Sequence, residues 1–137
     1  MADDSELDYI RTFLGKVHTS ATVKHISESK SIYSDKYGAG KTHRMLVEPG
    51  EVLSADNYRY VKRYKIKLSE TNEANLMSAF NNILEGILKF NRRETITDYT
   101  RPSVMNYIKL AYSNKAYEQD DGRWYEDIFL DITWSTS

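Results

Sequence analysis

The chain contains no cysteine among its 137 residues. This absence excludes disulfide bonds, thiolate metal sites and thiol nucleophiles, so the fold must be held together by packing alone. No apolar run reaches the roughly 18 residues that a membrane-spanning helix needs. The acidic start, Met-Ala-Asp-Asp-Ser-Glu, also lacks the apolar core of a signal peptide. We therefore expect synthesis in a cytoplasm and no membrane partner.

Proline and glycine are scarce as well, with 2 and 6 residues, and the sequence shows no internal repeat or low-complexity segment. A hydrophobic content of 40% is enough to build a real core, so residues 1–137 are expected to form a single domain. The formal net charge is −1 with 28% charged residues. Bulk charge therefore favours neither nucleic acid nor a membrane, and any such partner would have to bind a local patch.

The clearest pattern lies in the last third of the chain. Two strand-like runs, Val104–Ser113 and Arg123–Ser135, are joined by a turn-rich connector that contains Asp120-Asp121-Gly122. Side chains alternate across a strand, which divides the second run into two faces. One face carries Trp124, Glu126, Ile128, Leu130, Ile132 and Trp134, and the other carries Tyr125, Asp127, Phe129, Asp131 and Thr133. The pattern predicts a long C-terminal β-hairpin.

The middle of the chain predicts another long strand followed by a helix. In the strand, one face holds Tyr58, Tyr60, Tyr64, Ile66 and Leu68, and the other holds Arg59, Val61, Arg63, Lys65 and Lys67. The run Ser69–Asn72 then offers several N-caps for a helix over Glu73–Phe90. Its expected apolar stripe is Leu76, Met77, Phe80, Ile83, Leu84, Ile87 and Leu88. Asn91 and the pair Arg92-Arg93 are typical of a helix C-terminus.

The N-terminal half is less regular. An amphipathic helix is expected after an N-cap at Ser5, with Leu7, Ile10, Phe13, Leu14 and Val17 on its apolar face. Short strands are expected near residues 22–27 and 45–47, the second ending at the turn signal Pro49-Gly50. Between them, residues 28–44 are rich in Ser, Lys, Tyr and Gly and predict a long, flexible, solvated loop. The chain is therefore predicted to be an α+β domain: a mainly antiparallel sheet with two helices on one face.

The run Gly38-Ala39-Gly40-Lys41-Thr42 resembles the end of a phosphate-binding P-loop. A full motif needs a glycine five positions before the second glycine, and Asp35 stands there. The preceding residues also do not form the buried strand that should lead into such a loop. We therefore interpret this run as a glycine-containing loop and predict no bound nucleotide.

No other constellation indicates catalysis, a cofactor or a metal. His18, His25 and His43 lack the spacing of metal ligands, and a structural zinc site would normally include thiolates. Asp127 and Asp131 are four residues apart on one strand face, or about 13 Å at strand rise, which is too far for a carboxylate dyad. We therefore interpret them as solvated or salt-paired surface carboxylates. The protein is predicted not to be an enzyme and to have no catalytic, cofactor-binding or metal-binding residues.

The strongest candidate for a binding site is the basic strand face with its acidic counterpart. The predicted interface residues are Arg59, Arg63, Lys65, Lys67, Asp127 and Asp131. The basic residues, with tyrosines between them, resemble a surface that contacts phosphates. The alternative is structural, because an antiparallel sheet can pair this face with the acidic one through cross-strand ion pairs.

Charge also separates along the chain, with acidic ends and a basic region over residues 16–67. Opposite patches on a nearly neutral chain favour self-association. A patch that meets the other patch on a neighbouring copy makes a heterologous contact, which builds rings or open filaments. The loop at residues 28–44 would then be able to reach a neighbouring copy.

The order of elements from Tyr58 to Trp134 resembles the small tail-terminator and tail-completion proteins of tailed phages. The resemblance rests on the strand Tyr58–Leu68, the capped helix Glu73–Phe90 and the closing hairpin that ends in the run from Gly122 to Trp134. It implies a compact α+β subunit that forms a homo-oligomeric ring in the virion tail, joins head to tail, and contacts tail-tube or connector proteins. The alternative hypothesis is a small nucleic-acid-binding accessory protein that uses the basic strand face.

Overall fold

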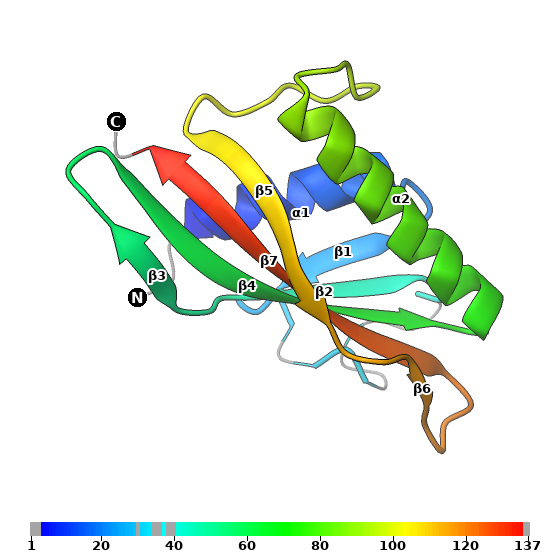
Figure 1. The fold of residues 1–137 in the computed structure, drawn as a ribbon. Helices are drawn as coiled ribbons and strands as arrows, with labels where there is room; N and C mark the ends of the chain where they lie inside the picture. The colour runs from blue at the N-terminus through cyan, green and yellow to red at the C-terminus, as the bar shows by residue number, and fades with distance from the viewer. Residues whose placement is uncertain (1–3, 30, 34–36, 38–40, 136–137) are drawn as a thin grey trace.

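The computed structural model describes residues 4–29, 31–33, 37 and 41–135. Two helices and a sheet make up the fold (Figure 1). In chain order the elements are α1 (Asp4–Val17), β1 (Thr22–His25), β2 (Arg44–Glu48), β3 (Val52–Ala55), β4 (Arg59–Glu70), α2 (Glu73–Asn91), β5 (Met105–Ser113), β6 (Tyr117–Glu118) and β7 (Trp124–Ser135).

The sheet has 7 strands with the order β1-β2-β4-β7-β5, while β3 pairs with β4 and β6 pairs with β7. Only the β1–β2 pair is parallel among the described strands. The α+β class, the mainly antiparallel sheet and the long C-terminal hairpin of β5 and β7 are confirmed.

The longest pairing joins β4 to β7, each of 12 residues, without a register shift from Arg59↔Ser135 to Glu70↔Trp124. Alternation along both strands divides the sheet into two faces as the sequence predicts. The inner face carries buried apolar side chains that form the centre of the core: Tyr64, Ile66, Leu68, Ile128, Leu130, Ile132 and Trp134.

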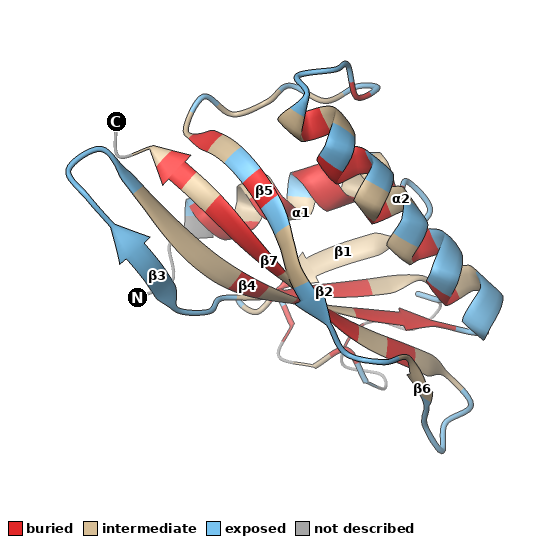
Figure 2. Ribbon diagram, in the orientation of Figure 1, coloured by how far each residue is buried: buried red, intermediate tan, exposed pale blue. Residues whose placement is uncertain are grey.

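Both helices cover this inner face and contribute to the same core (Figure 2). Phe13 of α1 packs edge-on against Phe90 of α2, with ring centroids 5.6 Å apart. Tyr99, in the connection that follows α2, packs against Phe13 at 5.8 Å. The two helices therefore pack on the sheet and on each other, which confirms that they share one face.

The inner face of α2 differs from the predicted stripe. Asn72 is the N-cap, and its side chain accepts a hydrogen bond from the Asn75 backbone N–H. The buried residues are Leu76, Ala79, Ile83, Gly86, Ile87 and Phe90. Met77 and Leu88, which the sequence placed in the stripe, are 60% and 52% exposed. The difference arises because the buried face includes two small residues, Ala79 and Gly86, which a stripe of large apolar residues leaves out. A Cβ atom at Gly86 would lie 2.3 Å from Val17 Cγ1, so α1 approaches α2 closely at this position.

The start of α1 also differs from the prediction. Asp4, the first described residue, is already helical, so Ser5 lies inside the helix and is not its N-cap. Glu6 is buried and accepts hydrogen bonds from the hydroxyl groups of Tyr60 and Tyr64, at 2.5 and 2.6 Å. Lys62 Nζ lies 2.9 Å from the same carboxylate and supplies the opposite charge. This buried cluster attaches α1 to β4, because a carboxylate without such partners would be costly to bury.

The segment over residues 28–44 contains no helix or strand before Arg44 among its described residues, but it is not simply solvated. Ile32 and Tyr37 are fully buried and form a second apolar cluster with Leu46 and Tyr125. The prediction of a solvated loop is therefore wrong at these two positions. Gly38, Ala39 and Gly40 of the P-loop-like run lie outside the described residues, while Lys41 and Thr42 are exposed.

Neither α1 nor α2, the helices found in the described ranges, combines the length and hydropathy needed to cross a membrane.

The corrected face of α2 gives a direct test of the core. Replacing Ile83, which is buried, with Ala should lower the free energy of unfolding by about 2–5 kcal/mol through lost burial and a cavity. The matched change at exposed Met77 should cost under about 0.5 kcal/mol. Urea denaturation of both variants measures the difference, and equal costs would contradict the assigned face.

Candidate interaction surface on the outer sheet face

All six predicted interface residues lie together on the outer face, which we define as the sheet face opposite the helices. On β4 this face carries Arg59, Val61, Arg63, Lys65 and Lys67, and on β7 it carries Tyr125, Asp127, Phe129, Asp131 and Thr133. The long β4–β7 register sets basic residues directly opposite acidic ones, because Arg63 faces Asp131 and Lys67 faces Asp127.

Arg63 and Asp131 form a two-pronged ion pair across the strands. Arg63 Nε and Nη2 donate to the two carboxylate oxygens of Asp131 at 2.8 and 3.0 Å. Hydrogen bonding to Asp131 raises the pKa of the Arg63 guanidinium. Asp131 is only 8% exposed and is therefore not a solvated carboxylate.

Asp127 is buried to the same extent and lies between two lysines. Its oxygens are 3.4 Å from Lys67 Nζ and 3.8 Å from Lys65 Nζ. Burial acts to lower the pKa of Lys67, but the hydrogen bond to the Tyr33 hydroxyl and the charge of Asp127 outweigh it and raise the pKa. The ion pairs of this face are therefore made within one subunit, as the cross-strand alternative predicts.

Arg59 is the exception in the basic row. It is exposed and makes no salt bridge with any described residue. The role of the six residues in an interface between subunits stays a prediction.

Aromatic side chains border the Arg63–Asp131 pair. Tyr112 of β5 stacks on Phe129 with ring centroids 4.3 Å apart, and the Arg63 guanidinium lies 5.3 Å from the Tyr112 ring centroid. A hollow of about 310 Å³ opens beside them. Its lining consists of Pro49, Gly50, Glu51, Arg63, Lys65, Tyr112 and Phe129.

Gly50 allows the chain to pass close to this part of the sheet. A Cβ atom at this position would lie 1.8 Å from the Arg63 carbonyl oxygen, which no side chain tolerates without movement of the backbone. The Pro49-Gly50 turn therefore fixes where β2 ends and where β3 begins along the same edge of β4.

The opposite end of the outer face is covered by the chain itself. Arg44 Nη1 donates to the Ile32 carbonyl oxygen at 3.1 Å, and Lys24 Nζ donates to that of Tyr37 at 2.6 Å. Tyr33 lies over Lys67 and packs on Tyr125 at 5.0 Å. The covered end and the hollow therefore share one sheet surface, and among the described residues the hollow end is the one left open to a partner.

A cluster of titratable groups that the sequence did not predict lies on the sheet face that the helices cover. Glu70, at the end of β4, is buried, and its carboxylate lies 2.5 Å from His43 Nδ1 and 4.0 Å from His18 Nε2. Asn82 of α2 contacts His18 Nδ1 at 2.8 Å. These residues are far apart in the sequence, so only the fold brings them together. Within the described ranges, no group of His, Cys, Asp or Glu side chains is arranged to hold a metal ion.

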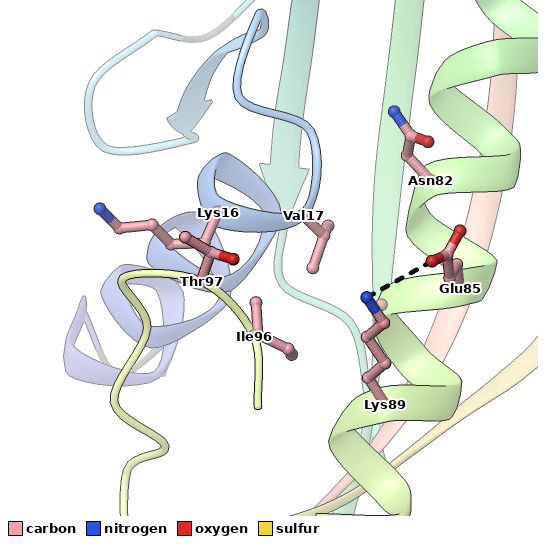
Figure 3. A pocket seen from close by; sticks show the side chains of 8 residues that line it. Lys16, Val17, Asn82, Glu85, Lys89, Ile96 and Thr97 are labelled. Carbon is pink, nitrogen blue, oxygen red and sulfur yellow. Dashed lines mark ion pairs between the residues drawn. The ribbon is translucent and has the colours of Figure 1, made fainter. Parts of the chain in front are cut away.

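A second hollow, of about 170 Å³, lies between the helices (Figure 3). The labelled side chains come from the end of α1, from α2 and from the connection after α2, with Lys89 paired to Glu85 at 3.4 Å. Its lysines are ordinary surface residues, so this hollow is a weaker candidate than the outer face.

No protein-family profile and no curated protein sequence matches this chain. A solved structure with a similar fold is a chain described as "Virion of native gene transfer agent (GTA) particle". The TM-score is 0.55 with 12% sequence identity, over 89% of this chain and 84% of that chain. At this identity the likeness shows a shared fold.

Arg63 and Asp131 should depend on each other for stability. Arg63→Met leaves the buried Asp131 carboxylate without its ion-pair partner and should lower the free energy of unfolding clearly more than a change at an unpaired basic residue. The control Arg59→Met changes a basic residue on the same strand face without breaking an ion pair, and should cost under about 0.5 kcal/mol. A double-mutant cycle with Asp131→Asn measures the coupling, and additive effects would contradict a tight pair.

Burial, with a smaller contribution from nearby His43, lowers the pKa of His18. The unfolded chain therefore binds a proton at this residue at a higher pH than the folded chain does. His18 should make the free energy of unfolding rise with pH up to about 6.5. Burial raises the pKa of Glu70, which makes the free energy of unfolding fall with rising pH in a lower pH range. The test therefore compares the wild type with a His18 variant at each pH. Urea denaturation between pH 5 and pH 7 should show a smaller pH-dependent gain for His18→Gln than for the wild type, and parallel curves would contradict the assignment.

Proposed function

We propose that this protein is a non-enzymatic structural component of a phage-like particle. More specifically, copies of the chain assemble into a ring in the tail, where the ring acts as a tail terminator or joins the head to the tail. The observation that carries the proposal is the similarity of fold, over 89% of the chain, to a chain of a gene transfer agent virion. It agrees with the resemblance to phage tail-terminator and tail-completion proteins that the sequence suggests.

The polar groups of the described residues support a structural role. The buried carboxylates Glu6, Glu70, Asp127 and Asp131 each have a cation or a histidine as partner. These partners join strands and helices to one another, as a rigid building block requires. A reactive site would instead present a polar group towards a cavity where a substrate enters.

The outer face is the surface that we assign to neighbouring proteins of the particle. Its open end combines the Tyr112–Phe129 stack with Arg63, and tyrosine and arginine are enriched among the residues that dominate protein–protein binding. Arg59, Arg63, Lys65, Lys67, Asp127 and Asp131 would then contribute a polar surface of mixed sign. The expected partners are other tail-tube or connector proteins.

The nucleic-acid alternative loses support from the same geometry. Arg63, Lys65 and Lys67 already face buried carboxylates, so their charge is largely neutralised for a phosphate backbone. Arg59 alone of the four basic residues has no such partner among the described residues. A row of unpaired cations would have favoured nucleic acid.

Two measurements on purified protein separate the functions. Light scattering should give a mass several times that of one chain, and a fluorescent random oligonucleotide should bind weakly at physiological salt. A monomer at all concentrations that binds the oligonucleotide with a steep salt dependence would favour the nucleic-acid function, because phosphate contacts release counterions.

A further inference from the structure

The sheet has two partly open edges at the end where β3 lies. There β3 pairs with β4, β4 with β7, and β7 with β5, so β3 and β5 form the two outer edges (Figure 1). An edge strand presents unpaired backbone N–H and C=O groups that another strand can bind. What covers these edges decides where a second chain can add.

Side chains of the same subunit seal the first half of the β5 edge. The Asn91 side chain both donates to the Ile108 carbonyl oxygen, at 2.7 Å, and accepts from the Ile108 N–H, at 3.0 Å. Arg101 Nη2 donates to the Asn106 carbonyl oxygen at 2.5 Å. These contacts occupy the positions of a neighbouring strand.

The second half of the β5 edge has no such seal among the described residues. Alternate residues turn their backbone N–H and C=O groups to the same side of a strand. The backbone groups of Leu110 therefore point away from β7, as those of Ile108 do. A register shift between Leu110 and Tyr112 then moves the next outward position to Ser113, which pairs with Ile128. Leu110 and Ser113 are therefore the outward positions of the open half.

The edge of β3 that faces away from β4, unpaired among the described strands, has the same spacing. Arg63 N–H donates to the Glu51 carbonyl oxygen and Asp56 N–H donates to that of Arg59, so Glu51 and Asp56 face β4. The backbone N–H and C=O groups of their neighbours Val52 and Ala55 therefore face away from β4. A register shift between Val52 and Ser54 produces this interval, which matches the interval from Leu110 to Ser113.

We propose that β3 of one copy adds, antiparallel, to the open half of β5 of a second copy of this chain. Val52 then lies opposite Ser113 and Ala55 opposite Leu110, so both outward positions of each strand find partners. This inference rests on the proposed function, since it names the contact by which copies assemble. The two edges differ, so the contact is heterologous and repeats from copy to copy into a ring or a filament.

Charge favours this pairing over the pairing of two β3 strands. Asp56 lies opposite Lys109 of the second copy, and Glu51 lies next to its Lys115. Both lysines are exposed and form no salt bridge with any described residue. Pairing of β3 with a second β3 would instead place Glu51 opposite Asp56, and like charges directly opposite each other are destabilising.

Exposed apolar side chains also favour a covered edge. Val52 is 54% exposed, Leu53 41% and Tyr112 47%. All three lie along the proposed junction. Since β3 lies level with the sealed half of its own β5, each copy must be displaced along the strand direction relative to its neighbour, as strands are in a closed barrel.

A proline at Val52 tests the backbone contact. The Val52 N–H faces away from β4, so Val52→Pro removes an outward donor and leaves the β3–β4 ladder intact. Sedimentation velocity should show a dissociation constant for self-association that is about tenfold higher or more, while the thermal midpoint stays close to that of the wild type. The control Val52→Ala keeps the donor and should assemble more tightly than the proline variant.

A charge exchange tests the partner strand. Lys115→Glu should weaken self-association, and adding Glu51→Lys should restore it in part, whereas Lys41→Glu at an exposed site away from both edges should have no effect. If the Val52→Pro and Lys115→Glu variants assemble as well as the wild type does, the proposed junction is wrong, while self-assembly itself stands. A wild type that stays monomeric at every concentration would overturn both the junction and the proposed function.

Discussion

The paired ladder of β4 and β7 is the constraint on which the rest of the structure depends. Its unshifted register sets one face of two long strands against the helices and the other face outward. A slip by one residue would turn the apolar side chains to solvent and the ion pairs into the core. The Arg63–Asp131 pair, made directly across this ladder, therefore contributes register specificity as well as stability. A slip of the register would break this pair and leave the buried Asp131 carboxylate without its partner, which is costly.

The elements predicted best are those in which one physical rule dominates. Strict alternation identified β4 and β7 and the residues of each face, because a half-buried strand has few other ways to satisfy its side chains. The six residues of the outer face were brought together for the same reason. Prediction failed where small or distant residues decide the packing. Ala79 and Gly86 lie on the buried face of α2, and Ile32 and Tyr37 are buried in a segment whose composition indicates a loop.

Clusters formed by distant residues were beyond sequence reasoning. Glu6 looks like part of an acidic N-terminus until the fold places it under Tyr60 and Tyr64. His18, His43 and Glu70 share no spacing that a motif would reveal. The ion pairs of the outer face were foreseen only as one of two alternatives, because nothing in a sequence states whether opposite charges meet within a subunit or between subunits.

The assembly that we propose uses the same sheet, because its two edges differ. Asn91 and Arg101 bind the backbone of one stretch of β5. The rest of β5 and the outer edge of β3 have backbone groups with no partner among the described residues, and their intervals match and their charges are opposite. The most direct measurement is electron cryo-microscopy of the purified, concentrated protein. Our account predicts closed rings or helical filaments in which strand density runs without a break from one subunit into the next. Isolated single subunits, or rings joined only through their helices, would contradict it.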